Sequence, residues 1–113
     1  MRQAFCHCHE CQRASGSAFA AIAAFPFDKV RITKGTPIFF DTERLRGGKN
    51  GRGFCGTCGS RLFSGNDGVV MGIMAASLDD PSLFNPTAHA FMSHARDWDP
   101  TKDKLPKFDT YLS

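Results

Sequence analysis

The chain has 113 residues, of which 42% are hydrophobic and 22% are charged. These values are close to the average of globular proteins, and they exclude intrinsic disorder, collagen-like chains and coiled coils. The balance of 14 Lys and Arg against 11 Asp and Glu gives a net charge of +3, which is too small to predict nucleic-acid binding. We therefore expect residues 1–113 to form a single small domain, whose partners must be inferred from its sites.

The sequence predicts no membrane span and no secretion signal. Its longest apolar stretch runs from Ala18 to Phe25, whereas a spanning helix needs about 20 apolar residues. Residues 1–5 lack the hydrophobic region of a signal peptide, so we expect a cytoplasmic protein. The five cysteines are odd in number and clustered, which favours a metal site in a reducing compartment over a disulfide scaffold.

The hydropathy pattern predicts a mainly β chain with no clear helix. Residues 17–25 fit a buried strand or a short helix equally well, and Pro26 ends that element. The glycine-rich residues 44–53 are expected to form a mobile loop, because glycine disfavours regular structure. The remaining predicted strands are a hairpin of Lys29–Thr33 and Pro37–Phe40, a second pair of Arg61–Ser64 and Val69–Met74, and a last strand at Thr87–Met92.

The cysteines form two motifs with the spacing of metal ligands. Cys6, Cys8 and Cys11 make a C-x-C-x2-C motif, and Cys55 and Cys58 make a C-x2-C motif with a glycine after each cysteine. Clustered soft thiolates favour zinc, and the second motif is typical of a zinc knuckle. A redox pair usually begins a helix in a βαβ unit, and iron–sulfur proteins use other spacings, so both alternatives fit less well.

The five sulfurs can be divided in two ways. Cys8, Cys11, Cys55 and Cys58 could form one closed zinc-ribbon site and leave Cys6 spare. Alternatively, Cys6, Cys8 and Cys11 could hold a zinc ion with one open position, as catalysis requires. The cysteine spacing alone leaves both open.

Other polar residues near these motifs are candidates for chemistry. His7 and His9 flank the ligands and could transfer a proton, although exposed loop side chains explain them equally well. His89 lies between two alanines, which favours a buried structural histidine. Arg13 and the basic loop with Arg44, Arg46, Lys49 and Arg52 could bind the carboxylates of a substrate, while a solvated loop is the simpler explanation.

Six motifs in a fixed order resemble one protein family: Cys6-His7-Cys8-x2-Cys11-Gln12-Arg13-Ala14-Ser15-Gly16-Ser17, Phe54-Cys55-x2-Cys58-Gly59-Ser60, Ser77-Leu78-Asp79-Asp80-Pro81, Pro86-x2-His89, Trp98 and Leu105-Pro106-x-Phe108. The family is that of the glutathione-dependent formaldehyde-activating enzymes, which includes centromere protein V-like domains. The resemblance covers nearly the whole chain. It implies a mainly β, Mss4-like fold of coiled, twisted antiparallel sheets with zinc knuckles.

The resemblance also implies an activity. It assigns a catalytic zinc to Cys6, Cys8 and Cys11, and carbon–sulfur lyase chemistry on the adduct of formaldehyde with a thiol such as glutathione. It assigns a second, structural zinc to Cys55 and Cys58 together with an upstream C-x-C pair on an early strand. This sequence contains neither that pair nor that strand.

Three explanations of the missing pair stay open. The start of the chain could be assigned too far downstream, another group could complete the second site, or the five sulfurs could regroup into one closed site. The last case leads to the alternative function, a non-catalytic zinc module that binds protein or nucleic acid.

Overall fold

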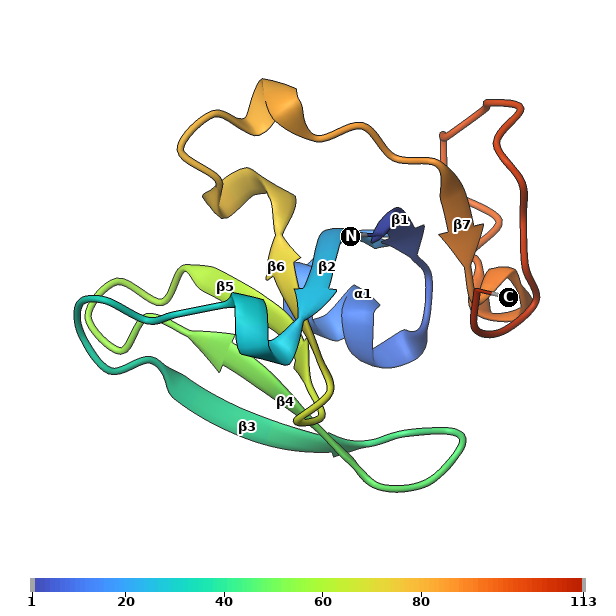
Figure 1. Cartoon of the computed structure of the whole chain (residues 1–113). Coiled ribbons are helices and arrows are strands. Elements are labelled where there is room, and N and C mark those ends of the chain that lie inside the picture. Colours follow the sequence, from blue (N-terminus) through green and yellow to red (C-terminus); the bar gives the residue numbers. More distant parts are fainter. Residues whose placement is uncertain (1, 113) are drawn as a thin grey trace.

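The computed structural model describes residues 2–112; Met1 and Ser113, at the ends of the expected single domain, lie outside the described residues. The prediction of a mainly β fold is confirmed. Seven strands form one sheet in the order β3-β4-β5-β6-β2-β1-β7 (Figure 1). Within residues 2–112, no helix has the length and apolar character needed to cross a membrane.

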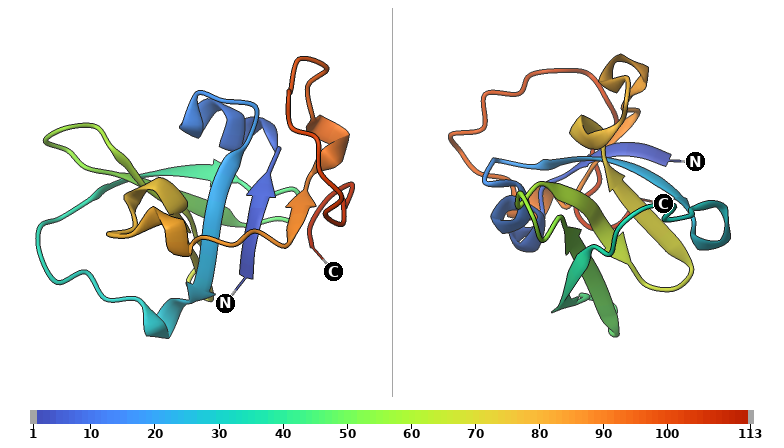
Figure 2. Two further views of the ribbon diagram at one scale, coloured as in Figure 1. Left: turned by 90° about the horizontal axis from the view of Figure 1, so that it is seen from above. Right: turned by 90° about the vertical axis from the view of Figure 1, so that its left-hand side faces the viewer.

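The sheet is mixed and strongly twisted. Its pairs are antiparallel, as expected, except at one edge, where β1 and β7 are parallel. The two views of Figure 2 show the β3–β4 hairpin turned away from the direction of β2, β1 and β7. The strands are β1 (Arg2–Cys6), β2 (Ala20–Pro26), β3 (Ile38–Glu43), β4 (Lys49–Phe54), β5 (Arg61–Asn66), β6 (Val70–Met74) and β7 (Ala88–Ala90).

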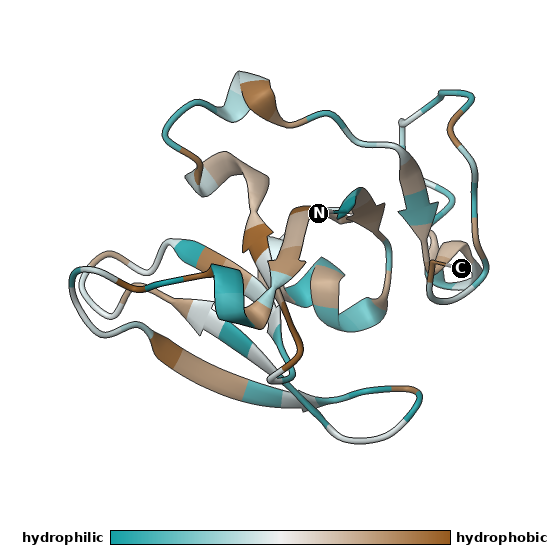
Figure 3. Cartoon of the chain, in the orientation of Figure 1, coloured by the Kyte–Doolittle hydropathy of each residue, from teal (hydrophilic) through white to brown (hydrophobic). Residues whose placement is uncertain are grey.

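Small side chains make up most of the core. Ala20 and Ala23 of β2 are almost fully buried, as is Ala18 just before that strand. Because these side chains are short, the helix α1 (His9–Ser15) can lie against β2 and β5. Larger apolar residues gather instead on the edge strand β3, where Ile38 and Phe40 are exposed (Figure 3).

The predicted hairpin of residues 29–33 and 37–40 does not form. Residues 27–29 make a short 3-10 helix and residues 30–37 form no strand. Ile32 is exposed, so the alternating pattern has no core to face. The second half of the prediction survives as part of β3, which pairs with β4 instead. The other predicted strands are confirmed within a few residues, and residues 17–25 contribute a strand, β2.

The expected mobile loop at residues 44–53 is wrong in its second half. Lys49–Phe54 is the strand β4, which lies between β3 and β5. Glycine is required at position 53 because aromatic rings cover the strand there: a Cβ at Gly53 would lie 2.7 Å from the ring of Phe39 and 2.8 Å from that of Phe63. Here packing against neighbouring strands outweighs the low strand propensity of glycine.

The sequence pattern also missed the helix α1. Its first turn is capped by Cys8, whose sulfur accepts the backbone N–H of Cys11, and its end is set by Gly16 in the left-handed conformation. The N–H of Gly16 donates to the carbonyl of Gln12 at 2.8 Å, which closes the helix. Seven residues are too few for a clear helical period, so the pattern of this segment does not predict a helix.

A methyl group added at Gly53 tests this packing. We expect Gly53→Ala to lower the free energy of unfolding by about 1–3 kcal/mol, because the rings of Phe39 and Phe63 must move. Gly51→Ala is the matched control, since its Cβ would approach Phe39 only to 3.3 Å and should cost less. Chemical denaturation measures both, and equal losses would contradict the proposed role of the rings.

Candidate metal centre

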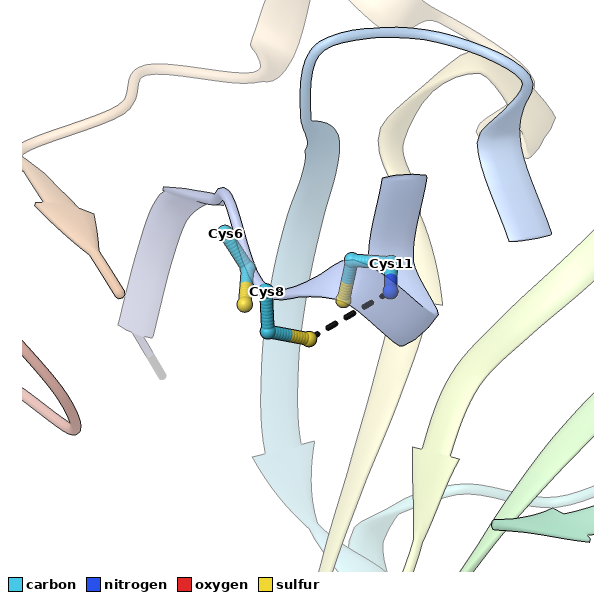
Figure 4. Close-up of side chains that lie close together, drawn as sticks. All are labelled: Cys6, Cys8 and Cys11. Carbon is cyan, nitrogen blue, oxygen red and sulfur yellow. Dashed lines mark hydrogen bonds between the residues drawn. The ribbon is translucent and has the colours of Figure 1, made fainter. Parts of the chain in front are cut away.

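One short segment brings three cysteines together at the end of β1. Cys6 is the last residue of β1, Cys8 is the N-cap of α1 and Cys11 lies in its first turn. Their three sulfurs lie within 4.8 Å of one another, and Figure 4 shows the side chains converging from the strand, the connection and the helix. Cys11 is buried, while Cys6 and Cys8 are partly accessible.

Hydrogen bonds distribute the protons of this cluster unevenly. The thiols of Cys11 and Cys6 donate to Cys8 and lower its pKa, and the N–H of Cys11, 3.3 Å from the Cys8 sulfur, and the charge of Arg52 act in the same direction. Hydrogen bonds to Cys11 and then to Cys8, followed by burial, raise the pKa of Cys6. The cluster therefore favours one thiolate on Cys8 even without a metal.

Arg52 supplies a buried positive charge next to the sulfurs. Its Nη1 lies 3.0 Å from the sulfur of Cys11 and donates to the hydroxyl of Ser64 at 3.1 Å, and its Nη2 lies 3.9 Å from the sulfur of Cys8. Arg52 is only 6% exposed. Burial alone would lower its pKa, but the sulfurs of Cys11 and Cys8 raise it above the usual value. Arg52 therefore stays charged and stabilises negative sulfur.

The cysteine cluster forms part of the wall of a cavity of about 600 Å³. Apolar side chains such as Ile22 and Phe91 form one part of the lining, and polar groups form the rest. A volume of this size accommodates a small organic molecule. The polar lining residues include Glu10, Glu43, Arg44, Asn50, Arg52, Ser64, His9, His94 and Tyr111.

Cys55 and Cys58 lie apart from this cluster. Among residues 2–112, the one group of three or more candidate metal ligands is Cys6, Cys8 and Cys11. Cys55 borders a different cavity, beside residues 30–38, and Cys58 is exposed. The hydroxyl of Ser60, 3.1 Å from the Cys58 sulfur, lowers the pKa of that thiol. The structure thus does not bring together the four sulfurs of the closed-site interpretation.

The histidines differ from the expectation at one position. His7 is fully buried, and its Nε2 lies 2.9 Å from Nδ1 of His89, so the exposed-loop interpretation of His7 is wrong. Burial, followed by the neighbouring His89, lowers the pKa of His7. His89 is buried and hydrogen-bonded, as predicted. His9 lines the large cavity, and its ring stacks on His94 with centroids 4.1 Å apart.

The other three candidate arginines occupy different places around the cavity. Arg44 lines it and pairs with Asp67 at 3.0 Å. Arg46 lies over the ring of Tyr111, 3.7 Å from the ring centroid. Tyr111 lines the cavity, whereas Arg46 is not among the lining residues. Arg13 is exposed and pairs with Glu10 at 3.0 Å.

Comparison with known proteins agrees with this geometry. The sequence model of the family described as "Glutathione-dependent formaldehyde-activating enzyme" matches residues 1–94. The chain belongs to this family. No curated protein matches it. The match to this glutathione-dependent formaldehyde-activating (GFA) family includes all five cysteines and Arg52. Two residues of the cavity wall, Tyr111 and Leu112, lie after the end of the match.

Several residues of the GFA-family site have no clear signal in the sequence. The sequence predicts a basic loop around Arg52, because the glycines on both sides of it hide the strand β4. Ser64 and His94 reach the site from β5 and from the turn after β7, and no motif marks them. That turn begins with Phe91 in the left-handed conformation (φ 57°), which is rare for an aromatic residue and directs the chain back toward α1.

Removing the charge of Arg52 tests its effect on the thiols. In metal-free protein we expect Arg52→Met to slow alkylation of the cysteine cluster several-fold at pH 7 and to shift the rate profile to higher pH. The reason is that loss of the nearby cation raises the thiol pKa. Arg46→Met is the matched control, since Arg46 stacks on Tyr111 instead. Identical profiles for wild type and Arg52→Met would refute the electrostatic role.

Proposed function

We propose that this GFA-family chain is a zinc-dependent carbon–sulfur lyase that forms and breaks the bond between a thiol and formaldehyde. The observation that carries the proposal is the convergence of three cysteine sulfurs on the wall of a cavity, beside a buried arginine. Glutathione is the proposed thiol, because the family to which the chain belongs is described by that substrate.

The three sulfurs suit zinc by their chemistry. All are soft donors, they come from one short segment, and they already lie within 4.8 Å of one another. Zinc held by Cys6, Cys8 and Cys11 would favour the thiolate form of a bound thiol and polarise a carbonyl group. Three protein ligands leave a position for substrate, and the neighbouring cavity gives access to it.

The residues of the chain would handle the substrate and its proton. Adduct formation joins the thiol sulfur to the formaldehyde carbon, and the thiol proton ends on the carbonyl oxygen, with no oxidant or reductant. His9 and His94 line the cavity and are suitable groups for that proton. His7, which the motif also suggested, is buried against His89, so we no longer assign it this role.

We propose Arg44 as the group that binds a substrate carboxylate. It lines the cavity, and its partner Asp67 is held by the backbone N–H groups of Val69 and Val70. A substrate carboxylate could share or replace that ion pair. Arg46 and Arg13 would act less directly, through the lining residues Tyr111 and Glu10.

Cys55 and Cys58 are proposed as a second, structural zinc site that is separate from the first. The lowered pKa of Cys58 favours the thiolate that a metal requires. Two sulfurs do not fill a zinc site, so further ligands must come from outside this pair. The five cysteines are all free thiols, which supports the proposal that the protein works in a reducing compartment such as the cytoplasm.

Metal analysis of purified protein tests the assignment of ligands. We expect X-ray absorption at the first site to show zinc with three sulfurs and one light atom. Cys11→Ser should remove this zinc, and Cys58→Ser should leave it in place because Cys58 lies outside the cluster. A shell of four sulfurs, or protein that binds no zinc at Cys6, Cys8 and Cys11 when zinc is supplied, would refute the assignment.

Catalysis is tested by the rate at which formaldehyde and glutathione exchange with their adduct. Exchange NMR spectroscopy should show acceleration by wild-type protein, abolished by Cys11→Ser. Arg44→Gln should weaken glutathione binding and leave a thiol without carboxylates, such as 2-mercaptoethanol, unaffected. A zinc-loaded protein that accelerates neither reaction would leave only the non-catalytic zinc-module interpretation.

A further inference from the structure

Two buried imidazoles lie behind the cysteine cluster. His7 and His89 are 0% and 1% exposed, and they are the largest side chains that the described core buries completely. Nε2 of His7 lies 2.9 Å from Nδ1 of His89. Buried polar groups of this kind are costly unless each has a partner, so their arrangement calls for an explanation.

Two carboxylates complete a chain of four groups. Both oxygens of Asp103 lie within hydrogen-bond distance of Nε2 of His89, at 3.1 and 2.9 Å. At the other end, Oδ2 of Asp99 lies 3.5 Å from Nδ1 of His7. This nitrogen is buried and has no hydrogen-bond partner in the described structure. The side chains of Asp99, His7, His89 and Asp103 therefore lie in a row. This row connects the C-terminal segment to His7, the middle residue of the C-x-C motif.

The carboxylate of Asp103 sets the direction of one of these hydrogen bonds. An ionised carboxylate only accepts, so Nε2 of His89 must carry the proton that it donates. The other ring nitrogen of His89, Nδ1, shares a hydrogen bond with Nε2 of His7, in which the donor depends on the tautomers of the two rings. The backbone N–H of Leu105 donates to Asp103 at 3.0 Å and fixes the carboxylate in turn.

His7 lies between the two cysteines and is fixed on its backbone as well as its ring. Cys6 ends a strand and Cys8 has extended backbone angles, so successive side chains alternate across the chain. The imidazole of His7 thus points away from the side on which both sulfurs lie. The backbone of His7 is fixed too, because its N–H donates to Ala90 at 3.0 Å and its carbonyl accepts from Gln12 at 2.7 Å.

The carboxylates come from residues outside the family match. The match ends at residue 94, whereas Asp99 and Asp103 follow it. The segment that carries them is anchored to β7, since the N–H of Phe108 donates to the carbonyl of His89 and the N–H of His89 to that of Pro106, both at 2.9 Å. The C-terminal segment is therefore part of the structure that supports the cysteines.

We propose that His7, His89 and Asp103 act as positioning residues that hold Cys6 and Cys8 in the arrangement required to retain the metal. The inference rests on the metal site of the proposed function, and it adds residues that touch neither metal nor substrate. Groups that orient metal ligands from behind typically change metal affinity 10- to 100-fold when they are removed.

Cobalt-substituted protein tests the proposal, because thiolate-to-cobalt absorption reports on the geometry of the sulfurs. We expect Asp103→Leu, which cannot accept from His89, to shift this absorption and to speed release of cobalt to a chelator about tenfold or more. Asp103→Asn retains an acceptor oxygen and should restore much of the wild-type behaviour. Asp103 lies in the partly exposed C-terminal segment, so both variants are expected to fold.

A control separates positioning from loss of stability. Ser93→Ala removes another anchor of the same segment, the hydrogen bond to the carbonyl of Asp109 at 2.6 Å, without touching the buried chain. It should leave the cobalt spectrum and release rate unchanged. The proposal is overturned if Asp103→Leu behaves like wild type, or if Ser93→Ala produces the same change. Wild-type protein that binds no cobalt would instead overturn the proposed function and this inference together.

Discussion

Three sulfurs that must lie within 4.8 Å of one another impose the main constraint on this structure. Thiols have little attraction for one another, and thiolates repel, so the backbone has to hold them in place. The strand β1 is paired on both sides, by β2 and β7, which fixes Cys6. The capped first turn of α1 fixes Cys8 and Cys11 relative to each other.

The small residues of the core follow from the same constraint. In the sheet, Cys6 lies opposite Ala20 of β2 and Ala90 of β7. Short neighbours on both sides leave room next to the sulfur, which large side chains would fill. The sheet thus combines a well-paired strand with space at its end, and that space continues into the cavity.

The sequence predicts contacts between residues that are close along the chain, and it does not predict contacts between residues that are far apart. The proximity of Cys6, Cys8 and Cys11 follows from their spacing, since a short curled segment must bring them together. The alternation of His89 with alanines correctly predicts its burial. By contrast, the contact between Arg52 and Cys11 depends on strand order, which no local pattern specifies.

The errors in the fold have similar causes. The glycine-rich strand β4 forms by pairing with β3 and β5, and the rings of Phe39 and Phe63 leave room only for glycine at position 53. Neither constraint is visible before the strands are paired. The pattern at residues 29–33 is a good local strand signal that finds no partner. Propensity therefore failed where tertiary packing set the outcome, and it succeeded for β5 and β6, which form a hairpin around a turn.

The buried arginine affects the charge balance of the proposed centre. Three thiolates around a divalent metal carry one surplus negative charge, which would oppose the approach of an anionic substrate sulfur. The guanidinium of Arg52, 3.0 Å from the Cys11 sulfur, offsets that charge. Because the arginine is buried, water screens this interaction less than it would at the surface. The position of Arg52 would therefore reduce the electrostatic cost of placing a thiolate at the open position of the proposed centre.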